Sequence, residues 1–304
     1  MKYMARQWLA KDTEERIKKM DGSEQSLNDT QRYILQVLQD VVRVLDELDI
    51  PYYMQGGTML GAIRHGGFIP WDDDVDLGIP RPQYERLLKE VSALLPENLE
   101  LRTYDDETDH HYYFARIVDK RYQIRRMGSL EERLENVWVD LFPLDGMPNG
   151  AAARAWHKFR LLMTRLKFHL SCFEKVNIKR PGRPLVERVI IRVAMITRVG
   201  KWFNTRKQLD KMDRLLKKYP LEQSDWIVNF TGQTSYKFNE MFKKDVYGQK
   251  TEYPFEHFRL VGPEKYDAYL KSLYGDYMTP PKVEDRNAHV SELVPIEETK
   301  KECD

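Results

Sequence analysis

The stretch that decides the fold covers residues 56–79 and reads GGTMLGAIRHGGFIPWDDDVDLGI. Two glycines and a threonine open it, and four aspartates gather near its end. Asp74 and Asp76 alternate with the apolar Val75 and Leu77, so residues 74–79 are predicted to form a strand. Side chains two positions apart on a strand project to the same face, which sets these two carboxylates beside each other.

The paired carboxylates indicate a metal site. Two carboxylates at this distance repel each other unless a positive charge lies between them. A set of oxygen ligands suits Mg²⁺ or Mn²⁺. Asp140, embedded in the apolar sequence VWVDLF on a predicted neighbouring strand, is costly to bury unless it is paired or metal-bound, and would be the third carboxylate. Asp72 and Asp73 also fit a solvated acidic loop.

The glycine turn before these aspartates indicates a phosphate site. Gly56 and Gly57 allow the backbone to approach a ligand closely, and Thr58 opens the predicted helix 58–64. The free N–H groups at such a helix start bind phosphate. A Gly-Gly-Thr turn alone often only connects two elements, but a following Asp-Val-Asp strand favours a nucleotide phosphate beside a divalent metal.

Composition limits the classes of protein that the chain can belong to. The chain has 304 residues with a net charge of +1, two cysteines and no long apolar run, so we expect no membrane-spanning helix, no secretory leader and no disulfide framework. Residues 150–219 hold 19 Lys and Arg against four acids, which leaves a charge of −14 on the remainder. Such a basic block predicts an anionic partner.

The order of predicted elements suggests an α+β catalytic half followed by a mainly helical half. Helices are predicted at 26–49, 58–64, 83–95 and 264–274, and strands at 52–55, 74–79, 112–119, 137–142, 226–230 and 255–261. We therefore expect an N-terminal extension at residues 1–25, a catalytic core at 26–149, and a mainly helical basic region at 150–304 that completes the site. Residues 184–203 resemble an interfacial helix on anionic lipid, although a helix packed on the catalytic half fits them about equally.

Three segments resemble the LicD family of phosphotransferases, which is related to fukutin and fukutin-related protein. They are YYMQGGTMLGAIRHGGFIPWDDDVDLGIPRPQYE at 52–85, VWVDLFPLDG at 137–146 and YDAYLKSLYGDYMTPP at 266–281. The resemblance implies a nucleotidyltransferase-like mixed sheet flanked by helices. It also implies metal-dependent transfer of a phospho-alcohol, most often phosphocholine, from a CDP-activated donor such as CDP-choline to a hydroxyl of a glycan. Asp74 and Asp76 are then metal ligands and Asp140 the third carboxylate.

Further polar residues are candidates for binding the substrates. Arg64 and His65 follow the short helix, and Arg116 lies on the predicted strand 112–119, where each could contact phosphate. Arg116 also fits an exposed surface charge, and His65 a structural role. Asp72, together with Arg286 and His289 after the Pro280–Pro281 pair, could contact substrate.

Two rival functions share some of these features. A nucleotidyltransferase that attaches NMP from an NTP to a small molecule, protein or RNA would use the same turn and aspartates. A nucleic-acid-binding protein would use the basic block, but it leaves Asp74, Asp76 and Asp140 unexplained, so no nucleic acid is expected. The favoured enzyme acts on a cell-surface glycan, such as teichoic acid or lipopolysaccharide, or on its lipid-linked precursor. It would be cytoplasmic, with peripheral contact to the anionic inner face of the membrane.

Overall fold

The computed structural model describes residues 27–104, 112–127, 133–171, 203–232, 237–282 and 290–296. The chain forms two compact units. The first comprises Met1–Leu101, Arg116–Phe142 and Lys244–Asp304, and the second comprises Arg102–Ala115 and Pro143–Lys243. The described residues after Lys243 therefore fold with the N-terminal part of the chain, from which the second unit separates them in sequence.

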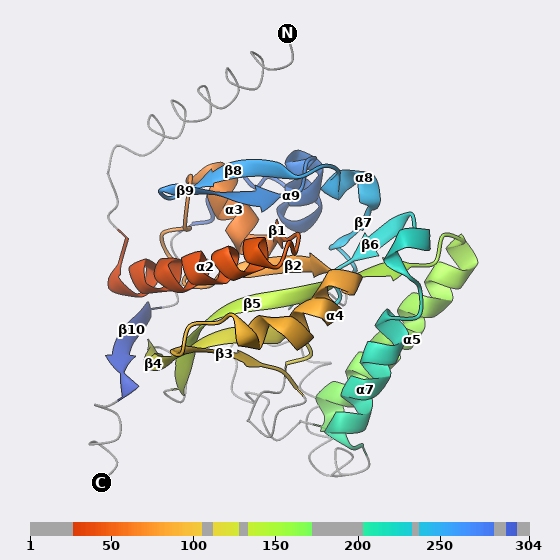
Figure 1. The fold of residues 1–304 in the computed structure, drawn as a ribbon. Coiled ribbons are helices and arrows are strands. Elements are labelled where there is room, and N and C mark those ends of the chain that lie inside the picture. Colours follow the sequence, from red (N-terminus) through yellow and green to blue (C-terminus); the bar gives the residue numbers. More distant parts are fainter. Residues whose placement is uncertain are drawn as a thin grey trace. The chain divides into compact units, whose positions relative to one another are not determined.

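A β-sheet forms the centre of the first unit (Figure 1). Its strands follow the order β1, β2, β5, β4, β10, with β3 also pairing with β4. The strands are β1 (Tyr53–Met54), β2 (Asp76–Pro80), β3 (Leu99–Arg102), β4 (Ala115–Met127), β5 (Arg133–Met147) and β10 (Val290–Pro295). The β1–β2 pair is antiparallel, with Tyr53 opposite Gly78, and β10 is antiparallel to β4. The neighbouring strands expected to carry Asp76 and Asp140, β2 and β5, thus lie side by side.

Helices and a hairpin accompany this sheet. They are α2 (Asp29–Glu47), α3 (Gly56–Arg64), α4 (Arg81–Glu90) with the 3-10 turn η1 (Val91–Ala93), α8 (Lys244–Tyr247), α9 (Tyr266–Tyr274), and the antiparallel strands β8 (Thr251–Phe255) and β9 (Phe258–Gly262). Asn28 and Gln31 form a reciprocal capping box that begins α2. The apolar stripe of α2, which the sequence predicts, is buried from Ile34 to Leu45.

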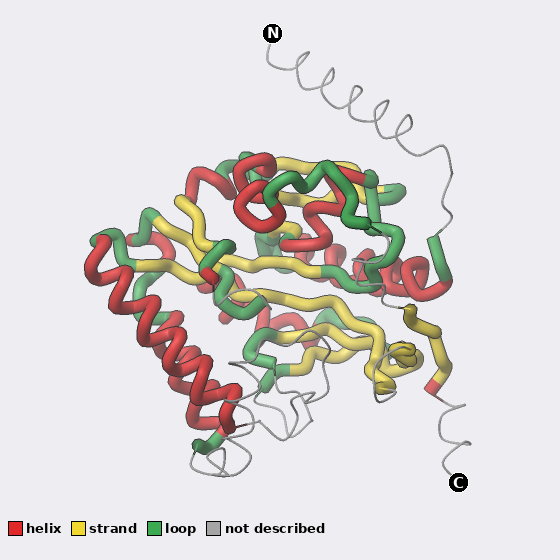
Figure 2. The backbone as a smooth tube through the Cα atoms, turned by 180° about the vertical axis from the view of Figure 1, so that it is seen from behind, coloured by secondary structure: helices red, strands yellow, loops and turns green. Residues whose placement is uncertain are grey.

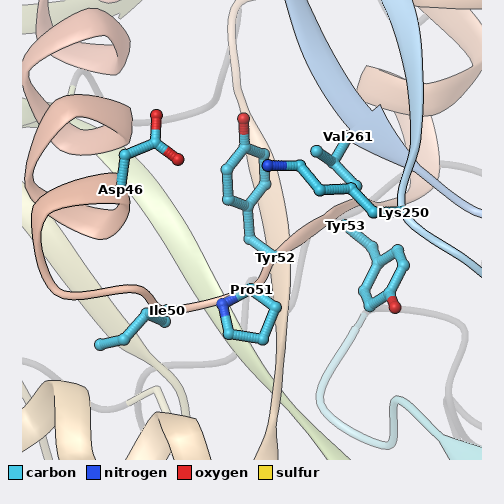
Figure 3. A pocket seen from close by; sticks show the side chains of 7 residues that line it. All are labelled: Asp46, Ile50, Pro51, Tyr52, Tyr53, Lys250 and Val261. Atoms are coloured by element: carbon cyan, nitrogen blue, oxygen red, sulfur yellow. The ribbon is translucent and has the colours of Figure 1, made fainter.

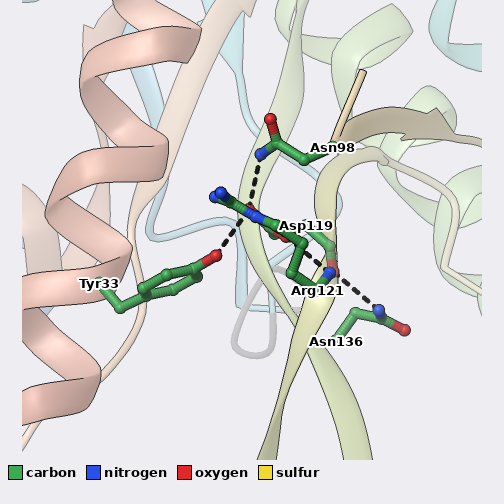
Figure 4. A network of polar contacts seen from close by, with 5 residues as sticks. All are labelled: Tyr33, Asn98, Asp119, Arg121 and Asn136. Atoms are coloured by element: carbon green, nitrogen blue, oxygen red, sulfur yellow. Dashed lines mark hydrogen bonds and ion pairs between the residues drawn. The ribbon is translucent and has the colours of Figure 1, made fainter. Parts of the chain in front are cut away.

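A polar network links several elements of the first unit (Figure 4). The Asp119 side chain on β4 is buried. Its Oδ2 atom accepts hydrogen bonds of 2.8–2.9 Å from Tyr33 on α2, from Asn98 before β3 and from Arg121. Asn136 on β5 donates to the Asp119 carbonyl. Burial alone would raise the pKa of Asp119, but the hydrogen bonds from Arg121, Asn98 and Tyr33 hold it below its ordinary value.

Two expected elements differ in the structure. Strand β2 begins at Asp76 instead of residue 74, although the Val75 carbonyl already accepts the Asp140 N–H and so runs beside β5. The single strand expected at 255–261 is wrong, because the chain reverses at Glu256 and His257 between β8 and β9. Glu256 has a φ of 54°, which helps the chain to turn back. The apolar residues on both sides of this turn conceal it in the sequence.

In the residues that the structure describes, the second unit contains two long helices and a small sheet. Helices α5 (Ala151–Ser171) and α7 (Thr205–Leu216) pack side by side (Figures 1 and 2). After the 3-10 turn η4 (Leu221–Gln223), β6 (Trp226–Val228) pairs with the end of β5 and with β7 (Met241–Lys243). The hydrophobic core of the second unit is made of Met147, Leu161, Met212, Leu215, Leu216, Val228 and Phe230.

The described part of residues 150–304 contains strands β6–β10 as well as helices, so the expected mainly helical region is not confirmed. The predicted interfacial helix at 184–203 lies outside the described residues except for Phe203. Within the parts of the chain that the structure describes, no helix is both long and apolar enough to cross a membrane.

Candidate active site

The first turn of α3 is tied to the strand that carries Asp76. Gln55 precedes the helix in an extended conformation, and its N–H donates to the Asp76 carbonyl at 2.9 Å. The Asp76 N–H in turn donates to Thr58 Oγ1 at 2.8 Å. The threonine predicted to open the helix therefore fastens the helix start to the beginning of β2.

The two glycines of this turn allow carboxylates to lie against the backbone. Gly56 has a φ of 47°, a conformation that L-residues rarely adopt, and a Cβ there would lie 3.4 Å from Asp76 Oδ2. A Cβ on Gly57 would lie only 2.8 Å from Asp72 Oδ2. Asp72 and Asp76 thus both lie near the helix start. The approach of Asp72 requires the absence of a side chain at Gly57, whereas Gly56 is required by its backbone conformation.

The carboxylates influence one another electrostatically. The pKa of Asp72 is raised well above its ordinary value by burial and by the charges of Asp74 and Asp73. Burial also raises the pKa of Asp140 to about 6, because Arg116 offsets this only in part and the charge of Asp74 adds to it. The charge of Asp74 therefore raises the pKa of both Asp72 and Asp140. The acids near the turn form one electrostatically interacting group.

Arg116 on β4 is the cationic neighbour of Asp140. Its Nε donates to Asp140 Oδ1 at 2.6 Å, and its guanidinium carbon lies 4.5 Å from the centre of the Trp138 ring. Glu135 lies 4.0 Å from the same guanidinium. The sequence predicted Arg116 as a phosphate ligand; the structure places it in the site, paired with the predicted third carboxylate.

The donors at this site fit a hard divalent cation by their chemistry. They are carboxylates whose burial and mutual repulsion raise the pKa of Asp72 and Asp140, and a bound cation relieves such repulsion. Among the residues that the structure describes, however, no three His, Cys, Asp or Glu side chains are already gathered around one point. Binding of a metal by Asp74, Asp76 and Asp140 would therefore require their side chains to rearrange.

Tyrosines from the C-terminal part of the chain surround the turn that begins α3. The Gly56 N–H donates to the Tyr269 hydroxyl at 3.0 Å. Tyr269 and Tyr247 both donate to Gln55 Oε1, at 3.2 and 3.0 Å. The Tyr274 hydroxyl lies 3.6 Å from the position of a Gly56 Cβ, and this side chain is 44% exposed. The sequence reasoning missed these residues, although Tyr269 and Tyr274 lie in the family-like segment 266–281.

The basic residues at the end of α3, Arg64 and His65, contact other parts of the first unit. Arg64 is buried, and its Nη1 donates to the Tyr277 carbonyl at 2.9 Å. The His65 ring lies edge-on to Trp71, with 6.0 Å between the ring centres. Arg64 therefore attaches the segment after α9 to the end of α3. That Arg64 and His65 contact phosphate stays a prediction. Arg286 and His289 lie outside the described residues.

A small pocket elsewhere in the first unit is not the substrate site. It is a cavity of about 40 Å³ between α2, β1, β8 and β9, lined by Asp46, Ile50, Pro51, Tyr52, Tyr53, Lys250 and Val261 (Figure 3). This volume accommodates only a few water molecules. It is far too small for a nucleotide.

Comparison with known proteins assigns this site to a class. Residues 49–165, which include the glycine turn and all the predicted carboxylates, match the family described as LicD/FKTN/FKRP, nucleotidyltransferase domain. Residues 49–165 therefore form a LicD family domain, which confirms the resemblance of the motifs in this part of the chain.

Three relatives illustrate how far the similarity extends. Lipopolysaccharide cholinephosphotransferase LicD of Haemophilus influenzae is 27% identical over 270 residues, which are 87% of this chain and 96% of the relative. Ribitol 5-phosphate transferase FKRP of Homo sapiens is 50% identical over 54 residues, 18% of this chain and 10% of that protein. Ribitol-5-phosphate transferase FKTN of Mus musculus is 29% identical over 145 residues, 47% of this chain and 28% of that protein.

Proposed function

We propose that this protein transfers a phospho-alcohol from a CDP-activated donor to a hydroxyl of a glycan, with phosphocholine as the first candidate. The observation that carries the proposal is the arrangement at the start of α3, where two glycines let Asp72 and Asp76 approach the turn. The activities named for the relatives support it, because they are cholinephosphate and ribitol phosphate transfer. The nearly full-length similarity to LicD makes choline the first alcohol to test.

In this proposal the donor pyrophosphate lies at the start of α3. The Gly56 N–H donates to Tyr269, so the backbone N–H groups of Gly57 and Thr58 are the ones assigned to phosphate. The positive end of the helix dipole favours an anion there. The nearby carboxylates repel it, so a cation is needed between them.

Asp74, Asp76 and Asp140 would hold that cation, Mg²⁺ or Mn²⁺. When bound, it neutralises charge on the transferred phosphoryl group and on the leaving CMP. Asp140 has a second candidate role, as the group that takes the proton from the acceptor hydroxyl. Arg116 holds Asp140 in place through its 2.6 Å contact and supplies positive charge beside the reacting phosphate.

A choline donor would also require an aromatic surface for its quaternary ammonium. Tyr274 is the candidate, because it is partly exposed and its hydroxyl lies close to Gly56. We infer in addition that the domain has a nucleotidyltransferase-like fold and acts on the cytoplasmic side of the membrane. The acceptor would be lipopolysaccharide, teichoic acid or a lipid-linked precursor.

Donor binding tests the proposal most directly. A thermal-shift panel would compare CDP-choline, CDP-ribitol, CDP-glycerol, CTP and ATP, each with and without Mg²⁺. A donor at a hundred times its dissociation constant stabilises the folded state by about 2.7 kcal/mol, which is a readily measured rise in Tm. We expect a CDP-alcohol with Mg²⁺ to give the largest shift and turnover to release CMP. A shift with ATP or CTP alone, followed by release of pyrophosphate, would instead favour the rival nucleotidyltransferase.

The variant Asp76→Asn tests the metal site. It removes one ligand charge but keeps the backbone bonds to Thr58 and Gln55, so transfer should fall at least about a hundredfold while the fold persists. The melting temperature without metal should hold or rise, because one source of repulsion is gone. Glu47→Gln, which changes an exposed acid at the end of α2, is the control and should retain activity. An Asp76→Asn enzyme with normal turnover at ordinary Mg²⁺ would remove Asp76 from the mechanism.

A further inference from the structure

An apolar surface on α5 is left exposed by the described residues of the second unit. Trp156, Phe159, Met163 and Leu166 are 62%, 49%, 37% and 46% exposed. Their spacing of three and four residues places them in one stripe along the helix. The rings of Trp156 and Phe159 are stacked, with 5.4 Å between their centres.

The fold of the second unit uses the other side of the same helix. His157, Leu161 and Thr164 are the buried residues of α5, and Leu161 joins the core formed with α7. Single exposed apolar side chains are ordinary on protein surfaces. Here, half of the eight large apolar side chains found exposed in the described residues lie on one helix. Such a continuous patch indicates an interaction surface.

The charges around the stripe indicate what covers it. Helix α5 contains five basic residues and no acidic one. Arg160 and Lys167 follow Trp156 and Met163 by four positions, which places them along one border of the stripe. At the other border, Lys158 lies over the Phe238 ring and Arg165 donates to the Phe230 carbonyl, so these cations stay near the protein surface.

This combination disfavours two other occupants of the stripe. A second copy of the chain would bring the same basic borders against each other with no acid to pair them. Residues 184–203 of this chain would likewise add Arg188, Arg192, Arg198 and Lys201 against a single acid, Glu187. A nucleic acid would match the charge, but it offers nothing to the apolar stripe.

We propose that the α5 stripe docks on the surface of an anionic lipid bilayer. Helix α5 would lie in the interfacial plane, with the four apolar side chains at the level of the acyl boundary and the flanking basic residues among the phosphates. Trp156 suits this position, because its ring is apolar and its N–H reaches the headgroup region. The proposal goes beyond transferase activity and does not depend on it, since it concerns binding alone.

Vesicle binding by the full-length protein tests this inference without any substrate. We expect flotation with phosphatidylcholine vesicles that contain phosphatidylglycerol, little flotation with phosphatidylcholine alone, and loss of binding as salt rises. In the double variant Trp156→Ser/Phe159→Ser the partition coefficient should fall about a hundredfold, because each apolar side chain withdrawn costs roughly tenfold. Both side chains are exposed, so the melting temperature should be preserved.

Matched variants distinguish vesicle binding by the stripe from nonspecific hydrophobic binding and from binding by charge alone. Leu134→Ser and Met278→Ser remove apolar side chains that are exposed to a similar degree outside α5, and both should bind vesicles as the unmodified chain does. Arg160→Gln/Lys167→Gln should weaken binding and flatten its dependence on salt. Brominated lipids should quench part of the tryptophan fluorescence, and Trp156→Phe should remove most of that quenching while binding remains.

Three outcomes would overturn the proposal. The first is absence of binding to anionic vesicles at low salt. The second is undiminished binding by Trp156→Ser/Phe159→Ser, with loss of binding instead when Arg188, Arg192, Arg198 and Lys201 are changed to Gln. The third is a dimer in light scattering that the stripe variant converts to a monomer, which would make a second copy the occupant.

Discussion

At the scale of single residues, Gly57 explains why the turn before the aspartates cannot carry a side chain. The sequence alone suggests that glycine lets the backbone approach phosphate. The structure adds a more direct reason, because a Cβ on Gly57 would lie only 2.8 Å from Asp72 Oδ2. The glycine is therefore needed to assemble the acidic group even before a substrate binds.

The variant Gly57→Ala measures this contact. The clash with a short, half-buried carboxylate should lower the free energy of unfolding by about 1–3 kcal/mol and weaken donor binding. Asp72→Ser removes the obstructing oxygen, so in the double variant Gly57→Ala/Asp72→Ser the loss of stability should be clearly smaller than the sum of the two single losses. Urea unfolding of the four proteins measures this difference. Additive losses would show that Asp72 is not what Gly57 accommodates.

At the scale of secondary-structure elements, α5 carries a buried histidine. The His157 side chain is 1% exposed, neither ring nitrogen has a hydrogen-bond partner, and Tyr219 meets the ring edge-on at 4.8 Å between centres. Burial, with the charges of Arg160 and Lys218, lowers the pKa of His157 to about 4. The helix thus presents one apolar face outward and holds a neutral imidazole on its inner face.

This histidine should make the protein sensitive to acid. Its folded pKa lies below the unfolded value of about 6.5, so the unfolded chain takes up the proton first and stability falls between about pH 6.5 and 4. The contribution approaches about 1.4 kcal/mol per pH unit in this window. His157→Leu should therefore flatten the decline of unfolding free energy between pH 7 and 5, measured by urea titration. His257→Leu, at an exposed turn, is the control, and equal slopes in His157→Leu and the unmodified chain would contradict the assignment.

At the scale of the whole molecule, the Asp119 network shows how distant parts of the chain become one folded unit. The buried Asp119 carboxylate joins α2, the segment before β3 and β4, and the Asp119 main-chain carbonyl adds a bond from Asn136 on β5 (Figure 4). These partners lie up to 86 positions away from Asp119 in the chain. The contacts can form only when the elements are already packed together, so their loss should affect global stability.

Asp119→Ala would leave three partly buried donors, those of Tyr33, Asn98 and Arg121, without their acceptor. We expect a loss of about 3–5 kcal/mol in the free energy of unfolding at pH 7, measured by chemical denaturation. Because the folded pKa is lowered, this stability is present above the unfolded pKa and is lost as pH falls through the folded one, so the difference should shrink in acid. Asp40→Ala, which breaks an exposed ion pair with Arg43, should cost less than about 1 kcal/mol. Equal costs for the two variants would exclude a central role for Asp119.

The sequence by itself determined the features that depend on neighbours along the chain. The periodicity of residues 26–49 predicted α2, the glycines and Thr58 predicted the start of α3, and the alternation around Asp76 predicted β2. The family motifs predicted membership in the LicD family. Each of these signals arises from side chains within a few positions of one another, whose spacing is set by helical or strand geometry.

Only the tertiary structure decided which residues meet across long stretches of chain. Tyr269 caps the Gly56 N–H from 213 positions away, and Arg116 pairs with Asp140 from the adjacent strand. The β8–β9 hairpin and the outward face of α5 were also hidden, because apolar side chains look alike in sequence whether they are buried or exposed. Burial and pairing depend on how all the elements pack, and this information is distributed over the whole chain instead of residing in any local pattern.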